Sequence, residues 1–186
     1  MPAVMSRKLF LLCFAVTVGL ILTNLPGSSA GACCCPPMWT AFQGTCYRYF
    51  SGQRLTWQEA ETQCQLFTTQ CWDKNATTSQ LGHLVSIHSQ AEMDFLIALF
   101  ESVRNKRVTG RQMVWIGLND LATEGTFVWS DGSDVDYTPW HTDQPNDYGN
   151  AQDCVEFGVE YTYKWNDLRC DPIDVWIVDD YVCKMG

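Results

Sequence analysis

The sequence is poor in basic residues. Lys and Arg together number 12 against 21 Asp and Glu in 186 residues, which gives a formal net charge of -9. A nucleic-acid-binding protein needs a basic surface to displace counterions from phosphate, so the composition argues against nucleic acid as a partner. The same shortage disfavours electrostatic docking on anionic membranes, whereas an acidic chain is compatible with cation binding.

Arrangements typical of catalysis or of zinc binding are also lacking. The three histidines, His83, His88 and His141, form no H-E-x-x-H motif and no nucleophile–base pattern. The cysteines include no repeated C-x-x-C pair of the kind that binds zinc. The sequence therefore predicts a protein without catalytic residues, which is not an enzyme.

Long apolar runs are absent after the N-terminus. There, Arg7 and Lys8 precede an apolar run at 9–22, and the small residues at 30–32 satisfy the small-x-small cleavage rule. This order predicts a signal peptide over residues 1–32. The alternative is a signal anchor, but the run is shorter than the roughly 20 residues that span a bilayer. We expect a secreted, extracellular protein with no membrane insertion after cleavage.

Nine cysteines remain after cleavage, and outside the cell they are expected to form disulfides. The odd number leaves at least one sulfur over. The adjacent Cys33, Cys34 and Cys35 favour a disulfide-linked homo-oligomer through Cys33 or Cys34. Internal pairing of Cys33 or Cys34 with Cys71 is an equally good alternative.

The hydrophobic pattern predicts one α+β domain over 33–186. The capping boxes Thr56-x-x-Glu59 and Ser89-x-x-Glu92 predict two helices, of which the first continues to about Phe67. Turn residues separate the runs expected to form a hairpin at 38–50 and strands at 84–87, 114–118, 127–130, 154–157, 163–165 and 181–184. Two helices followed by short strands are typical of the α+β class.

A long polar loop at 137–153 contains the candidate site. Its carboxylate and amide side chains are Asp143, Gln144, Asn146, Asp147, Asn150, Gln152 and Asp153. Loops of this length without secondary structure are usually functional. Calcium takes six to eight oxygen ligands and accepts both carboxylates and amides, and Asn166 and Asp167 offer two more. A solvated acidic loop is the alternative on composition alone.

The order of several short motifs is informative. They are Cys35-Pro36, Gly44-Thr45-Cys46-Tyr47, His83-Leu84-Val85-Ser86-Ile87, Trp115-Ile116-Gly117-Leu118, Gln144-Pro145-Asn146, Asp153-Cys154-Val155, Trp165-Asn166-Asp167 and Cys183. With this set the sequence resembles the C-type lectin domain family, in particular its small secreted invertebrate members. The resemblance implies a disulfide-stapled C-type lectin-like fold with two helices, small antiparallel sheets and a long calcium- and sugar-binding loop. It also implies the disulfides Cys35–Cys46, which marks the long form with an N-terminal hairpin, Cys64–Cys183 and Cys154–Cys170.

The resemblance implies a calcium ion that also binds two vicinal sugar hydroxyls. Its ligands would be Gln144, Asn146, Gln152, Asn166 and Asp167, with a cis peptide bond at Pro145. The family's mannose-type triplet is Glu-Pro-Asn and its galactose-type triplet Gln-Pro-Asp, so the Gln-Pro-Asn found here leaves the sugar preference open. Asp167 is the one carboxylate among the five ligands, so we expect calcium to bind weakly.

Some family members bind a second calcium ion nearby. The matching positions are Asp120, Glu124, Asp147, Gln152 and Asp153, four of which are carboxylates. We expect this auxiliary calcium site to bind more strongly than the sugar site. The alternative is that Asp120 and Glu124 are ordinary surface turn residues.

The sequence thus predicts a secreted calcium-dependent lectin whose partners are glycans or glycoproteins. Glycan recognition or agglutination, in innate immunity among other settings, is the function that the resemblance implies. Asn75 is an expected N-glycosylation site, because Asn75-Ala76-Thr77 is an acceptor sequence. The alternative function is a C-type lectin-like protein without sugar binding, which acts in protein interaction or in association with a mineral.

Overall fold

The computed structural model describes residues 35–69, 80–103, 112–171 and 178–186. The chain divides into the units Met1–Ala30 and Gly31–Gly186, and all described residues belong to the second. The predicted signal peptide at 1–32, Cys33, Cys34, Cys71 and the glycosylation site Asn75 lie outside the described residues. Within the described ranges, no helix is long and apolar enough to span a bilayer.

The predicted N-terminal hairpin is present. Strand β1 (Thr40–Phe42) pairs antiparallel with β2 (Thr45–Phe50). Gln43 and Gly44 join them with φ angles of 48° and 88°. Positive φ at both central residues is the turn geometry that matches the twist of a hairpin, and glycine adopts it without strain. The disulfide Cys35–Cys46 ties the first described residue to β2.

The first helix begins as its capping box predicts. In α1 (Trp57–Gln65), Glu59 N donates to Thr56 Oγ1 at 3.2 Å, and Thr56 N donates to Glu59 Oε2 at 2.9 Å. The helix ends two residues before Phe67, whose backbone N–H caps the Cys64 carbonyl at 3.0 Å. The Phe67 ring packs edge-on against Trp39, with 5.2 Å between the ring centroids.

The second helix, α2 (Gln90–Val103), has an altered capping box. Glu92 N donates to Ser89 Oγ at 3.2 Å as predicted, but the Glu92 carboxylate reaches back to His88 N at 2.8 Å. The same carboxylate accepts from Tyr47 OH at 2.6 Å and from Lys184 Nζ at 2.8 Å. Because Tyr47 lies on β2 and Lys184 on the last strand, Glu92 binds the start of α2 to the sheet.

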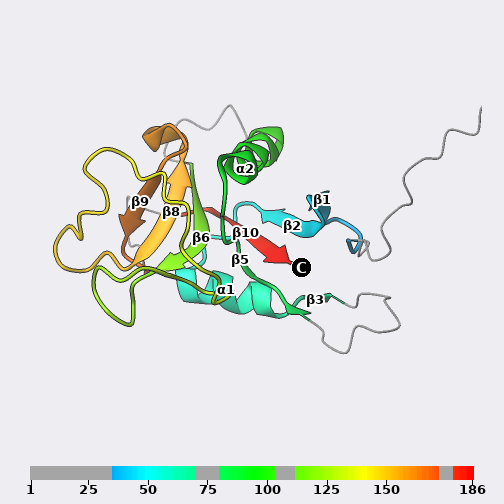
Figure 1. Cartoon of the computed structure of the whole chain (residues 1–186), viewed down its shortest axis with the longest axis horizontal. Helices are drawn as coiled ribbons and strands as arrows, with labels where there is room; N and C mark the ends of the chain where they lie inside the picture. The colour runs from blue at the N-terminus through cyan, green and yellow to red at the C-terminus, as the bar shows by residue number, and fades with distance from the viewer. Residues whose placement is uncertain (1–34, 70–79, 104–111, 172–177) are drawn as a thin grey trace, which may run out of the picture. The chain divides into compact units, whose positions relative to one another are not determined.

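The main sheet has eight strands in the described part of the chain, most of them paired antiparallel (Figure 1). Besides β1 and β2 they are β5 (His83–Leu84), β6 (Met113–Asn119), β7 (Val128–Trp129), β8 (Cys154–Gly158), β9 (Trp165–Leu168) and β10 (Asp180–Met185). The order is β1-β2-β10-β6-β8-β9, with β5 on β10 and β7 on β6, and β3 (Thr68–Thr69) and β4 (Gln80–Leu81) form a separate pair. One pairing departs from the expected antiparallel sheets, because β10 runs parallel to β6.

Strand β9 begins two residues later than the sequence predicts. The 3-10 helix at Val159–Tyr161 is followed by Thr162 and Tyr163, which have φ angles of 53° and 63°. Left-handed residues cannot continue a strand, so pairing with β8 starts at Trp165. Asn166 and Asp167 lie inside β9, on the strand that follows the long loop, as predicted.

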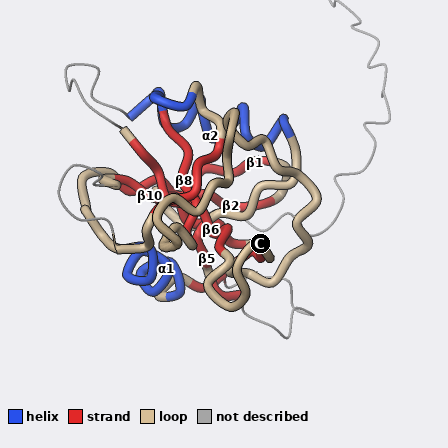
Figure 2. The backbone as a smooth tube through the Cα atoms, turned by 90° about the vertical axis from the view of Figure 1, so that its left-hand side faces the viewer, coloured by secondary structure: helices blue, strands red, loops and turns tan. Residues whose placement is uncertain are grey.

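The two helices lie on opposite sides of the central strands in both views (Figures 1 and 2). The apolar face of α2, Met93, Leu96 and Phe100, packs in one core cluster with Val114, Ile116 and Trp165 among others. The face of α1, Trp57, Ala60 and Cys64, packs in a second cluster with Leu84, Trp115 and Tyr181 among others. The sheet is therefore covered on both faces, as expected of a two-helix α+β domain.

Three disulfides staple the described residues, in the pairs that the family resemblance implies. Cys64–Cys183 joins α1 to β10 across 119 residues, and Cys154–Cys170 joins the start of β8 to the chain after β9. In the chain-entropy account, closing a loop of about 100 residues stabilises the folded state by roughly 4–5 kcal/mol. Cys154–Cys170 holds β8 and β9 together next to the long loop.

Gly117 on β6 is packed too closely for any side chain. A Cβ atom there would lie 2.7 Å from both the Leu84 carbonyl oxygen and Ser130 Oγ. We expect Gly117→Ala to lower the free energy of unfolding by about 2–3 kcal/mol, as other overpacked cores do. Urea unfolding measures this. Gln58→Ala on the exposed face of α1 is the control, with a change within about 0.5 kcal/mol; equal midpoints for both variants would contradict the packing argument.

Candidate functional site

The long loop is anchored at its start on Trp165. The Trp165 ring lies 5.5 to 5.8 Å, centroid to centroid, from the rings of Trp129, Tyr137 and Trp140, each in an edge-on arrangement. Its backbone N–H donates to the Pro139 carbonyl at 3.1 Å, and its carbonyl accepts from His141 N at 2.8 Å. These contacts fix the start of the loop against the first residue of β9, directly before Asn166 and Asp167.

Asp167 holds the middle of the loop. Its side chain is 1% exposed, and Oδ2 accepts from the backbone N–H groups of Asn146 at 2.9 Å and Asp147 at 2.6 Å. The Gln144–Pro145 peptide bond just before them is cis, as the resemblance implies. The structure therefore brings the Gln-Pro-Asn triplet and Asp167 together, although they lie about twenty residues apart in sequence.

The second half of the loop closes on Gln152. Gln152 N donates to Asp147 Oδ1 at 3.1 Å, and Gln152 Oε1 accepts from Tyr148 N at 2.7 Å. Asp147 and Asn150 have positive φ angles of 41° and 52°, and Asn150 N donates to the Asp147 carbonyl at 2.9 Å. Tyr148 is 81% exposed at the tip of this turn. Asp147 thus links the Gln152 segment to the triplet that Asp167 holds.

Asn166 lies on β9 beside Asp167, and its contacts are on the neighbouring strand. Asn166 Nδ2 donates to Glu156 Oε1 at 3.1 Å, and the sheet register places Glu156 directly opposite Asn166. Sequence reasoning did not single out Glu156. A glutamate next to the buried Val155 and Phe157 was the available signal, since charged residues are almost never fully buried without a partner.

Two residues of the predicted sugar-site set and one of the auxiliary set have side-chain oxygens that suit a hard cation. Among the described residues, Asp167 Oδ1, Gln144 Oε1 and Asp120 Oδ1 are buried oxygen atoms without a hydrogen-bond partner. A buried acceptor left without a donor costs about 1–3 kcal/mol, so three of them in and around one loop need an explanation. All three are oxygen atoms of carboxylate or amide groups, the donor type that calcium prefers.

Burial and neighbouring negative charge raise the pKa values of three carboxyl groups near the loop. Burial raises the pKa of Asp167 above its ordinary value, against the lowering effect of the Asp147 and Asn146 N–H groups. Burial also raises the pKa of Asp120, and the charges of Asp153 and Asp167 add to it. The pKa of Glu124 is also raised. Loss of hydration is the largest cause, and the negative charges of Asp120, Asp147 and Asp153 add to it. Positive charge placed among these groups would relieve that repulsion.

The predicted auxiliary calcium set is held near the loop by the backbone. Asp120 N donates to the Asp153 carbonyl at 3.0 Å, and Asp120 Oδ2 accepts from Gly125 N at 2.8 Å. In the described part of the chain, however, no three His, Cys, Asp or Glu side chains converge closely enough to hold a metal ion. Asp120, Glu124, Asp147 and Asp153 interact through their charges without forming a closed set of ligands.

A second constellation, at Ser133, His88 and Asp136, has the distances of a catalytic triad. Ser133 Oγ lies 3.2 Å from His88 Nε2, and His88 Nδ1 lies 2.8 Å from Asp136 Oδ1. A general base must accept the proton of the nucleophile. Here the single hydroxyl proton of Ser133 is donated to Asp131 Oδ1 at 2.5 Å, so the contact with His88 requires that His88 donate. The group links the start of α2 to the loop before the candidate site and lacks an activated serine.

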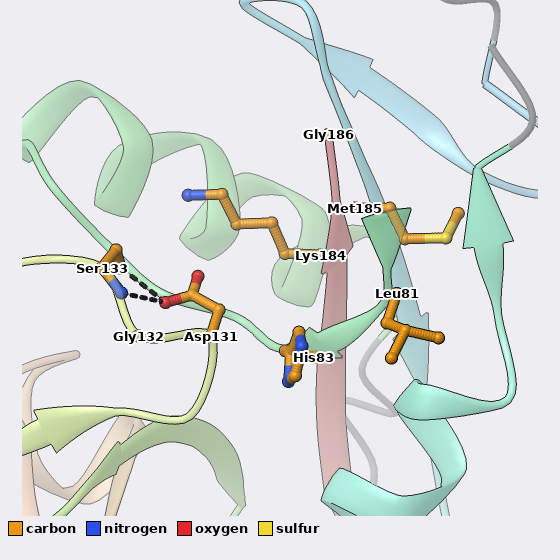
Figure 3. Close-up of a pocket in the computed structure, with 8 residues that line it drawn as sticks. All are labelled: Leu81, His83, Asp131, Gly132, Ser133, Lys184, Met185 and Gly186. Carbon is orange, nitrogen blue, oxygen red and sulfur yellow. Dashed lines mark hydrogen bonds between the residues drawn. The ribbon is translucent and has the colours of Figure 1, made fainter. Parts of the chain in front are cut away.

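Ser133 also lines a surface hollow of about 540 Å³ (Figure 3). Its walls are Leu81, His83, Asp131, Gly132, Ser133, Lys184, Met185 and Gly186. Lys184 Nζ donates to the Ser86 carbonyl at 2.9 Å as well as to Glu92, and His83 Nδ1 contacts Glu61 Oε1 at 2.6 Å. The hollow shares no residue with the predicted site.

Comparison with known proteins identifies the family of the chain. Residues 53–185 match the Lectin C-type domain family. The chain belongs to the C-type lectin domain family. Relatives include the alpha-N-acetylgalactosamine-specific lectin of Patiria pectinifera, 43% identical over 181 residues that cover 94% of this chain and 95% of that protein. Echinoidin of Heliocidaris crassispina is 38% identical over 152 residues, 82% of this chain and 97% of that protein.

Solved structures place the chain in the same family. The C-type lectin CEL-I from Cucumaria echinata has a TM-score of 0.67 and 32% identity, covering 82% of this chain and 97% of that one. This confirms the predicted fold class, with its two helices, sheet and three disulfides. The family is one of carbohydrate-binding lectins rather than enzymes.

The raised pKa of Asp120 gives a pH-dependent prediction. The pKa of Asp120 is higher in the folded state than in the unfolded state. The folded protein therefore becomes less stable as the pH rises above the unfolded-state pKa, because ionisation of Asp120 opposes folding. In EDTA, the stability of Asp120→Asn relative to the wild type should therefore increase between about pH 3 and pH 7. Urea midpoints across this range measure it. Asp134→Asn, at an exposed loop position, is the control, and parallel curves for Asp120→Asn and wild type would contradict the argument.

Proposed function

We propose that this chain is a secreted lectin that binds glycans through calcium at the long loop. The ligand set is Gln144, Asn146, Gln152, Asn166 and Asp167. Membership of a carbohydrate-binding family supports the class of ligand. The calcium dependence rests on the site itself, and the three structural disulfides are consistent with an extracellular protein.

The proposal rests mainly on the different surroundings of the two carboxylate oxygens of Asp167. One carboxylate oxygen holds the loop backbone at Asn146 and Asp147, and the other is buried without a partner in the described residues. Bound calcium would supply a positive charge and coordination positions for two vicinal hydroxyls. The chain's own part is to hold its oxygen atoms in place beforehand and to donate amide N–H groups to the sugar.

The composition of the site predicts weak calcium binding. Four of the five ligands are amides, so Asp167 alone offsets the charge of the ion, and calcium affinity depends on ligand charge. We infer that extracellular, millimolar calcium is needed to fill it. The four carboxylates Asp120, Glu124, Asp147 and Asp153 are proposed as an auxiliary calcium site. Loss of hydration is the main cause of the raised pKa values of Asp120 and Glu124, and neighbouring negative charges add to it; a bound cation would relieve that added repulsion.

N-acetylgalactosamine is the first sugar to test, because a 43% identical relative is named for that specificity. The mixed triplet Gln144-Pro145-Asn146 matches neither family type, so mannose belongs in the same panel. A single shallow site for a small polar ligand binds weakly. Covalent pairing through Cys33 or Cys34 would give two sites per molecule and the avidity needed for agglutination, including that of microbes in innate immunity.

The test is binding to a glycan panel in millimolar calcium and again in EDTA. We expect calcium-dependent binding, which Asp167→Asn abolishes because it removes the sole carboxylate of the site. Calcium affinity, measured by titration calorimetry, should fall at least about 100-fold, since even outer-shell substitutions cost about 10–100-fold. The amide can still accept the two backbone hydrogen bonds, so the fold should persist.

Asp134→Asn is the matched control, because it removes a carboxylate from an exposed loop position outside the ligand set. It should bind calcium and glycan as the wild type does. Glycan binding that survives both EDTA and Asp167→Asn would refute the site. A folded wild type that binds no glycan in either buffer would favour a protein-interaction or mineral-associated role.

A further inference from the structure

Glu156 is a buried carboxylate that the calcium ligand set does not use. It lies in the middle of β8 and is 0% exposed. Removing a carboxylate from water is expensive unless hydrogen bonds replace the hydration. One such bond comes from the candidate site, where Asn166 Nδ2 donates to Glu156 Oε1 at 3.1 Å. The two residues are direct cross-strand neighbours of β8 and β9.

This bond decides which end of the Asn166 amide faces the strand. The oxygen and nitrogen ends of an amide have nearly the same shape, but one accepts and the other donates. Glu156 Oε1 is the acceptor in this pair, so the NH2 group of Asn166 faces Glu156. The reversed amide would place two acceptor oxygens about 3 Å apart, which is repulsive. Asn166 is 4% exposed, so water cannot compensate for the reversed orientation.

The orientation matters for the ion. Calcium binds oxygen atoms, and an amide ligand must therefore present its carbonyl oxygen. With its NH2 group turned to Glu156, Asn166 has Oδ1 on the opposite edge of the amide. A reversed side chain would instead direct N–H groups at a cation. The site has a single carboxylate, so the loss of one correctly oriented oxygen ligand should lower the calcium affinity substantially.

We propose that Glu156 is the positioning residue of the calcium site, which fixes the Asn166 amide with its oxygen available to the ion. The inference rests on the proposed function, in which Asn166 is a ligand. Glu156 itself is not a ligand in this arrangement and acts through Asn166. Outer-shell partners that orient metal ligands in this way typically change metal affinity about 10–100-fold when substituted.

Two other roles for Glu156 must be separated from this one. A buried negative charge would attract calcium over a distance without orienting anything, and a structural role would affect folding alone. The variant Asn166→Asp distinguishes them, because a carboxylate has two equivalent oxygens and needs no orientation. Positioning therefore predicts that the effect of Glu156→Gln depends on which residue is at 166, whereas the other two roles predict no such dependence.

The experiment is a double-mutant cycle of Glu156→Gln and Asn166→Asp, with calcium affinity measured by titration calorimetry in the absence of glycan. In the wild-type background, Glu156→Gln should weaken calcium binding about 10–100-fold, because glutamine can also donate and thereby permits the reversed Asn166 amide. In the Asn166→Asp background, Glu156→Gln should leave the affinity unchanged or raise it. There it removes the repulsion between two facing carboxylates and can donate to the new one.

Glu61→Gln is the matched control. Glu61 is a second buried glutamate, accepting from Leu84 N at 2.8 Å on the α1 side of the sheet. Its substitution should lower the urea midpoint and leave calcium affinity unchanged. An equal loss of affinity for Glu156→Gln in both backgrounds would show that its charge acts at long range and would overturn the proposal. No loss in the wild-type background would overturn it as well.

A measurement on the wild type covers the case in which Glu156→Gln does not fold. The side-chain NH2 protons of Asn166 should be protected from hydrogen exchange in NMR spectra, and they should stay protected when calcium is added. Protection lost on calcium binding would mean that the ion takes Asn166 away from Glu156, against the proposal. A wild type that binds no calcium at all would instead refute the proposed function on which the inference depends.

Discussion

The site depends on two hydrogen bonds, in which one carboxylate oxygen of Asp167 accepts from two backbone N–H groups of the loop. The loop between β7 and β8 has little regular pairing of its own, and its backbone groups need partners elsewhere. Asp167 provides them at Asn146 and Asp147, and Trp165 provides a surface for the aromatic residues at the start of the loop. Both residues belong to β9, which Cys154–Cys170 and the pairing with β8 hold in place.

The carboxylates at the site lower the stability of the domain when no cation is bound. The disulfides and the two apolar cores stabilise the domain, while burial and nearby negative charge raise the pKa values of Asp167 and Asp120 beside the loop. A rigid frame can tolerate a local loss of this kind, and such losses are characteristic of functional sites. In this domain the frame is the covered sheet, and the buried carboxylates Asp167 and Asp120 lie on β9 and in the chain after β6.

Local signals in the sequence predicted much of the fold. The Thr56–Glu59 capping box and the hairpin turn at Gly44 depend on neighbouring residues, so the sequence is enough to find them. Composition was enough to select the polar loop with Asn166 and Asp167 as candidates, but the exact ligand set and the disulfide pairs came from the family resemblance, because no local pattern places positions 146 and 167 together.

Contacts between distant segments could not be predicted where neither a local motif nor the family resemblance implies them. The Glu92 carboxylate joins β2, β10 and the residue before the α2 cap, which no capping motif specifies. The contact between Glu156 and Asn166 follows from the register of β8 and β9, and the left-handed pair Thr162 and Tyr163 sets that register by delaying β9.

The place of β10 in the sheet has a consequence for how the domain comes apart. Asp180–Met185 form the strand between β2 and β6, and Cys183 is the partner of Cys64. The sheet order joins the β1–β2 hairpin to β6, β8 and β9 through β10 alone. If β10 detaches, the main sheet divides into two parts. The Cys64–Cys183 disulfide ties this strand to α1, so it opposes that separation directly.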